Sequence, residues 1–225
     1  QSCEYVLFSD DFSIPSVWQS QGSGDVNVGN GICNFANVYS GSYNRVYQAT
    51  SSIFPDNYWR ADFDFSILNP NAYGGVGEVL LALTAGPLDF ISYDLSQGYL
   101  ETTQDGIAVI LHSDNANDND INHWYFIIEG KKGSTRLFDI GNVIHANAAI
   151  SDYYIRLERS SYGLTQLSIC TDHNYTNHLP GSPVTYAIDP TITGLNHVQH
   201  GTSTPGTPTR NINATIDNDF ICGDR

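Results

Sequence analysis

The chain lacks methionine and has few basic residues. Its 225 residues include no Met, and 9 Lys and Arg stand against 24 Asp and Glu, for a formal net charge of -15. This surplus of negative charge excludes nucleic acid as a partner, because phosphate backbones are bound through Lys and Arg. Gln1 cannot be a translated start, so we expect that a leader has been removed before it and that the protein is secreted or displayed on the cell surface.

Long apolar runs and helical periodicity are also missing. No stretch approaches the roughly 18 apolar residues of a membrane span, so we expect no membrane insertion. No segment of ten or more residues repeats apolar side chains at helical spacing, and no Pro, Gly and Ser linker divides the chain. The 14 Tyr, 10 Phe, 20 Gly and 9 Pro suit many short strands joined by tight turns. We therefore expect residues 1–225 to form a single all-β domain.

Several segments have the pattern of strands. Residues 59–67 alternate strictly between apolar and polar side chains, which is typical of a strand with one buried face. Residues 78–84 and 106–112 are almost continuously apolar, as in a central strand buried on both faces. Residues 153–159 and 164–170 flank a short turn and predict a hairpin.

The two ends of the chain resemble each other in kind. Residues 210–223 alternate between apolar and polar side chains and then carry acids, a short apolar segment and a cysteine. Residues 5–12 likewise combine a short apolar strand with two acids, shortly after a cysteine. We interpret the two segments as antiparallel neighbours that close one β-sandwich.

Four cysteines, an even number, favour two disulfides in an oxidising compartment. If the terminal strands pair antiparallel, Cys3 lies close to Cys222, so we prefer this bridge and leave Cys33 to pair with Cys170. A zinc site is not favoured, because no two cysteines stand two to four residues apart.

The most polar segment, residues 114–120, offers hard oxygen ligands from Asp114, Asp118 and Asp120. This composition suits calcium, although the glycine and glutamate of an EF-hand loop are missing. A solvated hairpin tip rich in Asn and Asp is the alternative.

Two further pairs have a possible chemical role. Asp62 and Asp64 share the polar face of one predicted strand, roughly 7 Å apart, and could act as acid and base in glycoside hydrolysis. A solvated sheet face explains them equally well. His197 and His200 could coordinate a metal, although such a pair more often lies in a polar loop.

Short phrases along nearly the whole chain carry a resemblance to a known superfamily. They are FSDDFS at 8–13 with Trp18, GICNF at 31–35, WRADFDF at 59–65, the hairpin 154–170, GLNHVQHG at 194–201 and TIDNDFI at 215–221. With this strand order the sequence resembles the concanavalin A-like lectin and glucanase superfamily, specifically the laminin G-like modules of secreted bacterial proteins. The resemblance implies a jelly-roll sandwich of two antiparallel sheets, one of them concave.

The resemblance also implies a site and a class of ligand. A structural calcium ion near the joined termini would fall at Asp10, Asp11, Asp217 and Asp219. Ligands of the superfamily are typically glycans held on the concave face or by rim loops. The Glu-x-Asp-x-x-Glu motif of its glycoside hydrolases is absent here, so enzymatic activity is not favoured.

Three hypotheses follow. The first is a secreted or cell-surface carbohydrate-binding module with calcium, in which tyrosines in or beside predicted loops stack on sugar rings. These are Tyr73, Tyr99, Tyr162 and Tyr175, and partial burial of an amphipathic side chain is the alternative reading for each. The second is a structural or adhesive surface protein that assembles with copies of itself. The third is a glycoside hydrolase or lyase that acts on polysaccharide through Asp62 or Asp64.

Overall fold

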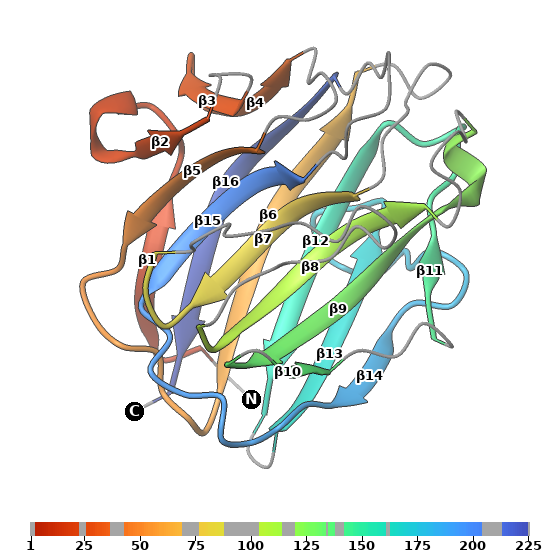
Figure 1. The fold of residues 1–225 in the computed structure, drawn as a ribbon. Helices are drawn as coiled ribbons and strands as arrows, with labels where there is room; N and C mark the ends of the chain where they lie inside the picture. Colours follow the sequence, from red (N-terminus) through yellow and green to blue (C-terminus); the bar gives the residue numbers. More distant parts are fainter. Residues whose placement is uncertain are drawn as a thin grey trace.

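The fold is a sandwich of two antiparallel sheets packed face to face (Figure 1). The computed structural model describes residues 3–22, 26–36, 43–68, 77–87, 104–113, 120–133, 135–137, 142–160, 163–203 and 213–224. The prediction of an all-β jelly roll is confirmed. Within these described residues, no helix has the length and hydrophobicity needed to cross a membrane.

The back sheet of Figure 1 contains both ends of the chain. Its order is β14 (Val184–Ala187), β13 (Leu164–Cys170), β12 (Asp152–Arg159), β6 (Trp59–Ile67), β16 (Asn213–Gly223), β4 (Ile32–Ala36) and β3 (Val26–Gly29). Strand β1 (Tyr5–Asp10) pairs with the second half of β16, beyond the part that pairs with β4.

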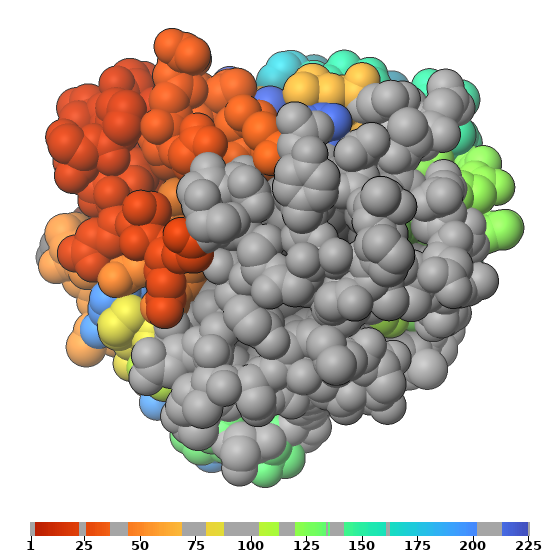
Figure 2. Space-filling model, turned by 45° about the horizontal axis from the view of Figure 1, so that its top comes forward, coloured from red at the N-terminus to blue at the C-terminus, as the bar shows by residue number. Residues whose placement is uncertain are grey.

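The front sheet is built from strands in the middle of the sequence together with β2, β5 and β15. Its order is β10 (Thr135–Leu137), β9 (Trp124–Lys132), β8 (Gly106–Ser113), β7 (Gly77–Thr84), β15 (His197–Ser203), β5 (Tyr43–Ala49) and β2 (Gln19–Gln21), with β11 (Ile144–His145) on β9. Two single 3₁₀ turns, η1 (Pro15–Val17) and η2 (Ile121–His123), interrupt the strands. Figure 2 shows the red and orange N-terminal elements together at one corner of the molecule.

The main core lies between the sheets. The apolar residues of β6 point into it at every second position, and Trp59, Phe63 and Phe65 are each at most 1% exposed. A second buried cluster lies on the other face of the front sheet and includes Ala108 and Ile110. Strand β8 is therefore buried on both faces, which explains its continuous apolar sequence.

The hairpin of β3 and β4 turns at Asn30 and Gly31, whose φ angles are 55° and 77°. Two successive positive φ angles are those of a type I′ turn, whose twist matches that of the flanking strands. Asn and Gly are the residues that adopt these two positive φ angles most readily.

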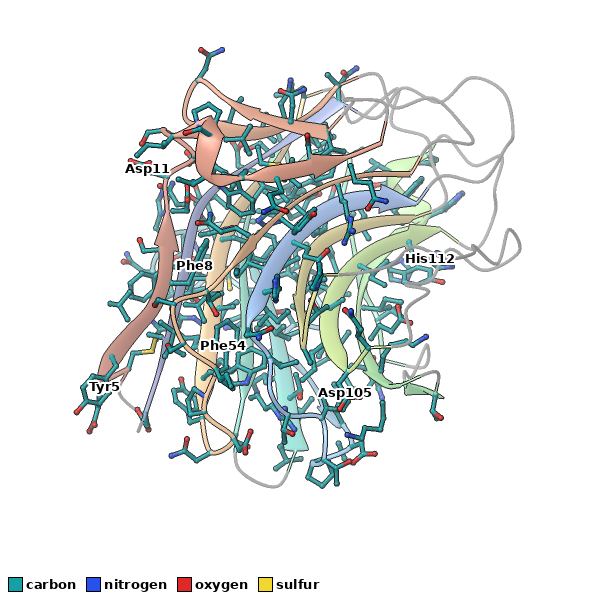
Figure 3. The ribbon with its side chains drawn as sticks, turned by 60° about the vertical axis from the view of Figure 1, so that its left-hand side comes forward. Tyr5, Phe8, Asp11, Phe54, Asp105 and His112 are labelled. Atoms are coloured by element: carbon teal, nitrogen blue, oxygen red, sulfur yellow. A yellow bond between two sulfur atoms is a disulfide. The ribbon has the colours of Figure 1, made fainter. Side chains whose placement is uncertain are left out.

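The two ends of the chain pair antiparallel, from Tyr5 opposite Gly223 to Asp10 opposite Asp219. A disulfide joins Cys3 to Cys222, with their Cα atoms 5.4 Å apart. Both predictions are confirmed. Figure 3 shows Tyr5 pointing away from the sandwich beside this bond. In the chain-entropy account, closing so long a loop destabilises the unfolded chain by about 5 kcal/mol.

The predicted bridge between Cys33 and Cys170 is wrong, and both thiols are free and buried. Cys33 lies on β4 and Cys170 on β13, with β12, β6 and β16 between them in the same sheet. Four strand spacings of about 4.8 Å separate the two by about 19 Å, far beyond disulfide reach. Burial raises the pKa of the Cys33 thiol well above its usual value, and burial raises that of Cys170 to about 11.

A buried polar contact crosses the core between the sheets. The Nε2 atom of His200 on β15 lies 2.5 Å from Oδ2 of Asp219 on β16. A β-bulge between Asp217 and Phe220, with Asn218 at φ 56°, shifts the alternation of β16 by one residue and turns Asp219 inward.

This pair must hold a proton. The Nδ1 atom of His200 lies 2.6 Å from the carbonyl oxygen of Leu80, so Nδ1 carries a hydrogen, and the contact between Nε2 and Asp219 needs another. Burial lowers the pKa of His200. The Asp219 carboxylate and the Leu80 carbonyl raise it by a larger amount, so the net shift is upward. Burial raises the pKa of Asp219 against the opposing effect of His200.

The neighbouring titratable groups also favour the protonated form of the His200 and Asp219 pair. The carboxylates of Asp10 on β1 and Asp217 on β16 raise the pKa of Asp219, and Cys33 on β4 is a neutral thiol whose pKa the Asp219 charge raises. The aromatic rings of Phe12, Trp18 and Phe63 enclose the imidazole. Folding at neutral pH therefore takes up one proton at this pair.

We predict that stability falls as pH rises from 6.5 to 8. The unfolded histidine is neutral above its ordinary pKa of about 6.5, while the folded pair keeps its proton, so the free energy of unfolding decreases by up to about 1.4 kcal/mol per pH unit. Urea unfolding at pH 6, 7 and 8 measures the slope. Asp219→Asn should remove it, because the amide can donate to neutral His200 without an ionisable proton.

The exposed His123 provides the control for this experiment. His123→Asn removes a histidine on η2 whose side chain is 64% exposed and lies 4.0 Å from Asp120, and it measures how much of the pH slope comes from a histidine outside the core. A wild-type stability that is flat or rising between pH 6.5 and 8 would contradict the proton held by His200 and Asp219.

Candidate functional site

The outer face of the back sheet carries rows of polar side chains that run across neighbouring strands. Pairing in register places Arg60 beside Glu158, Glu158 beside Gln166, and Gln166 beside Thr185, on β6, β12, β13 and β14. The next row contains Asp62 and Arg156, and the row after it Asp64 and Tyr154. Adjacent strands lie about 4.8 Å apart, so each row presents polar groups at close spacing.

An ion-paired group occupies the middle row. Arg156 donates to both carboxylate oxygens of Asp62, at 2.8 and 2.9 Å, and Arg60 Nε lies 3.1 Å from the same carboxylate. Burial lowers the pKa of Arg156, but its bonds to Asp62 outweigh this and the net shift is upward. Arg156 thus binds both oxygens of Asp62 in the bidentate geometry typical of a guanidinium and a carboxylate.

Asp64, in the next row, has a different environment from Asp62. Burial raises its pKa, while a hydrogen bond from Asn218 Nδ2 at 2.9 Å acts against the rise. The sequence predicted that Asp62 and Asp64 share the polar face of this strand, and they do. The bidentate pairing of Asp62 does not favour their use as the acid and base of a hydrolase.

Tyr175 lies over the row that contains Asp62 and Arg156. Its ring is 3.8 Å from the Arg156 guanidinium carbon, and its hydroxyl donates to the carbonyl oxygen of Ile155 at 3.3 Å. The Asp172 carboxylate holds this loop by accepting bonds from Thr176 Oγ1 at 2.6 Å and from a following backbone amide. Tyr175 is half-buried, so the structure places one predicted tyrosine on the polar face of the back sheet. The other three, Tyr73, Tyr99 and Tyr162, lie outside the described residues.

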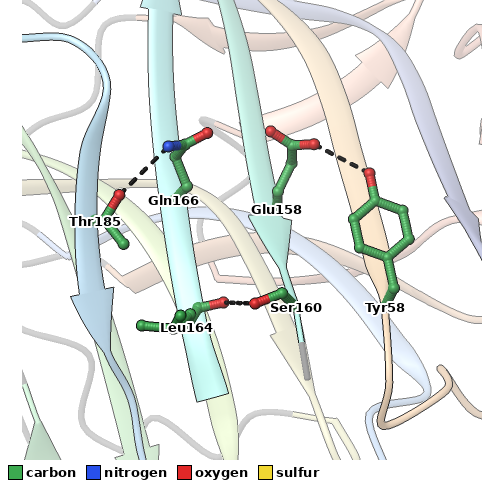
Figure 4. Close-up of a pocket in the computed structure, with 6 residues that line it drawn as sticks. All are labelled: Tyr58, Glu158, Ser160, Leu164, Gln166 and Thr185. Carbon is green, nitrogen blue, oxygen red and sulfur yellow. Dashed lines mark hydrogen bonds between the residues drawn. The ribbon is translucent and has the colours of Figure 1, made fainter. Parts of the chain in front are cut away.

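A cavity of about 270 Å³ opens beside the first row (Figure 4). Its lining consists of Tyr58, Glu158, Ser160, Leu164, Gln166 and Thr185. We refer to it as the Glu158 pocket. The Tyr58 hydroxyl donates to Glu158 Oε1 at 3.0 Å, and Gln166 Nε2 donates to Thr185 Oγ1 at 3.3 Å. The strands therefore fix two polar pairs on opposite sides of one opening.

The electrostatics of the Glu158 pocket favour hydrogen bonding to a ligand. Burial, followed by the charge of Glu158, raises the pKa of Tyr58 to about 12, so its hydroxyl stays protonated as a donor. Within the described part of the chain, the second oxygen of Glu158 and the side-chain carbonyl of Gln166 remain as acceptors. Leu164, 48% exposed, adds an apolar wall. Binding of a polar ligand with apolar ring faces is the chemistry that this arrangement supports.

The four carboxylates predicted to bind calcium near the termini do not form one ligand set. Asp219 points into the core toward His200, whereas Asp217 lies opposite Asp64 on the outer face, because the bulge between them reverses the alternation. Asp10 accepts bonds from the amide of Phe12 and from the side chain of Gln48, and Asp11 binds the amide of Ser13. Across the described ranges, no three His, Cys, Asp or Glu side chains gather as a metal site. These residues do not fit the ion.

Of the polar segment 114–120, the described residues include only Asp120; Asp114 and Asp118 lie outside them. The Asp120 carboxylate caps η2, where its Oδ1 accepts from the amide and the side chain of Asn122 at 3.0 and 2.8 Å. His197 and His200 lie on one strand three residues apart and so face opposite sides of the sheet, which excludes a shared metal.

Sequence reasoning missed the Glu158 pocket. Its residues come from segments more than 120 positions apart, and they meet only because β12 lies between β6 and β13. The available signal was the polar half of the predicted hairpin, where Glu158 and Gln166 occupy outward positions of facing strands.

No protein family and no curated protein sequence matches the chain. Solved structures do match its fold. The carbohydrate-binding module CBM2 of the evolved Dit protein of Lactobacillus casei BL23 phage J-1 has a TM-score of 0.63 at 10% identity, over 96% of this chain and 94% of that one. The acidic lectin of winged bean, solved with methyl-α-D-galactose, has a TM-score of 0.63 at 11% identity, over 96% and 97%.

The exoplasmic or lumenal domain of VIP36, solved with Ca²⁺ and Man3GlcNAc, has a TM-score of 0.62 at 13% identity, over 95% of this chain and 89% of that one. At these identities the similarity shows the fold alone. The chain has the concanavalin A-like lectin fold, as the resemblance in its sequence implied.

Proposed function

We propose that this chain is a carbohydrate-binding, lectin-like module. The observation that carries the proposal is the Glu158 pocket, which joins a carboxylate, an amide and hydroxyl groups to the apolar wall of Leu164. Sugars present hydroxyl groups at their edges and apolar C–H faces, so they need both kinds of surface. The lectins and the carbohydrate-binding module that share the fold support the same class of ligand.

The pocket is organised before a ligand arrives. Tyr58 fixes one oxygen of Glu158, and Gln166 and Thr185 fix each other across β13 and β14. Side chains that are already held lose less conformational entropy on binding, which favours affinity. The Glu158 carboxylate is also the strongest class of acceptor for sugar hydroxyls, because its hydrogen bonds are charge-assisted. Tyr175, on the adjacent row, extends this surface with an aromatic ring.

We predict that the wild-type protein binds glycans and that Gln166→Ala weakens binding about fivefold. The substitution removes one net hydrogen bond, about 1 kcal/mol, and frees Thr185 from its partner. A glycan array identifies the ligand, and calorimetry with that ligand measures the change. Gln19→Ala, an exposed glutamine on β2 of the other sheet, is the matched control and should have no effect.

The failure of the wild-type protein to bind any glycan would overturn the proposed function. Glycan binding that Gln166→Ala leaves unchanged would keep the function and move its site away from the Glu158 pocket.

The proposal includes secretion and a calcium ion. The Cys3 to Cys222 disulfide supports an oxidising compartment. For calcium we retain the segment 114–120, whose acids are suited to it. We predict that a chelator lowers the melting temperature of the protein by several degrees and that added calcium restores it, because an ion bound to the folded state stabilises that state. Equal melting temperatures in calcium and in chelator, measured by calorimetry, would remove calcium from the proposal.

A second candidate function is self-assembly, which an exposed apolar patch at the terminal edge favours. Tyr5, Val6 and Ile53 are 41%, 62% and 63% exposed and line one opening at the surface. Within the described residues, β1 pairs only with β16, which makes it an edge strand. Edge strands present unpaired backbone groups that can pair with a second chain.

If this edge binds a second copy, light scattering should show a dimer at micromolar concentration and Val6→Lys should return it to a monomer. Ile14→Lys, at a site 58% exposed outside this patch, serves as the control. A wild-type protein that stays monomeric up to high concentration rules out assembly through β1.

A further inference from the structure

We infer that the Glu158 pocket selects neutral, hydroxyl-rich glycans and rejects acidic ones, such as uronic acid or sulfated chains. This inference rests on the proposed function and names the ligand class of the same site. The hydrogen-bonding groups in the pocket and the charges around it both favour a neutral ligand.

The hydrogen bonds within the pocket engage three of its donors and leave the second N–H of Gln166 and the hydroxyl hydrogen of Thr185 for a ligand. The Tyr58 hydroxyl donates to Glu158, the Ser160 hydroxyl donates to the Leu164 carbonyl, and one N–H of Gln166 donates to Thr185. Tyr58 keeps its proton at neutral pH, because burial and the neighbouring carboxylate raise its pKa to about 12. What the pocket then offers to a ligand is rich in acceptors.

Two strong acceptors face the opening: Oε2 of Glu158 and the side-chain carbonyl of Gln166. The carboxylate of Glu158 has oxygen atoms that accept hydrogen bonds and no N–H group to donate. A ligand that satisfies these acceptors must bring O–H donors, and the hydroxyl groups of a neutral sugar do so. A ligand carboxylate or sulfate brings acceptors instead, and would leave the acceptors of the pocket unpaired.

The arginines on the described parts of β6 and β12 near the pocket contact other groups of the protein. Arg156 donates to both oxygens of Asp62, and Arg60, beside Glu158 in the first row, lies 3.1 Å from the same carboxylate. Arg159, the next residue on β12, is buried and donates to the carbonyl oxygen of Ile192.

Among the described residues that line the pocket there is no Lys or Arg, and Arg is the residue that usually recognises carboxylate and sulfate groups. Glu158 itself repels such a ligand, and like charges brought together at a binding surface are costly. The net charge of -15 adds repulsion at longer range. Both the local and the overall electrostatics therefore oppose acidic glycans.

The test compares a neutral oligosaccharide with the matched oligosaccharide of the same length whose sugars are uronic acids. Calorimetry at physiological salt should show the neutral ligand bound at least about tenfold more tightly. Glu158→Gln removes the repelling charge and adds donors, so it should weaken the neutral ligand, strengthen the acidic one and reduce their ratio by about tenfold.

Asp152→Asn is the control. Asp152 lies on the outer face of the same strand, six residues from Glu158 and about 20 Å away, so the substitution makes the same change in net charge outside the pocket. It should leave the ratio unchanged. A ratio that both substitutions reduce equally would assign the selectivity to the overall charge and overturn the inference.

The remaining outcomes separate the inference from the proposed function. Tighter or equal binding of the acidic ligand overturns the inference and leaves the function standing, whereas binding of neither ligand overturns the function. If Glu158→Gln lowers the melting temperature, Tyr58→Phe provides a second variant, since it removes the phenol donor but keeps the ring. It should alter the affinity for the neutral ligand, and an unchanged affinity would place the ligand outside the pocket.

Discussion

The hydrogen-bonded register of the back sheet controls both the core and the candidate site. Strand β6 points Trp59, Phe63 and Phe65 into the sandwich, and the same alternation points Asp62 outward, opposite Arg156. A slip of one residue between β6 and β12 would expose the rings and bury the charges, so the apolar core itself fixes which polar groups meet on the surface. The row that contains Glu158 and Gln166 follows from that constraint, because a sheet with this core has one arrangement of its outer face.

The bulge in β16 is the place where this regular alternation is broken, and the break has a chemical result. It sends Asp217 to the outer face and Asp219 into the core, where Asp219 meets His200 across the gap between the sheets. A buried carboxylate needs a partner that can share its charge or its proton, and the imidazole does both. The Asp219 carboxylate therefore lies in the core and cannot bind a metal at the surface.

Local patterns in the sequence were enough to predict the strands and the joined ends. Alternation at 59–67 revealed a face of β6, and the similar ends of the chain led to the Cys3 to Cys222 bond. The predicted bridge between Cys33 and Cys170 was wrong because local patterns do not reveal the order of strands in a sheet. Three strands separate these two cysteines. The Glu158 pocket was missed for the same reason. The predicted calcium site was wrong because one extra residue in β16 places Asp217 and Asp219 on opposite faces of the sheet.

The bond between Cys3 and Cys222 joins residues 219 positions apart and closes the chain into one covalent ring. Tension applied to the polypeptide outside these two cysteines therefore passes from one sulfur to the other and bypasses both sheets. A protein held at its ends in a moving fluid or between two surfaces would keep its sandwich, and the surface of its outer face, free of mechanical load until this single covalent bond is cut.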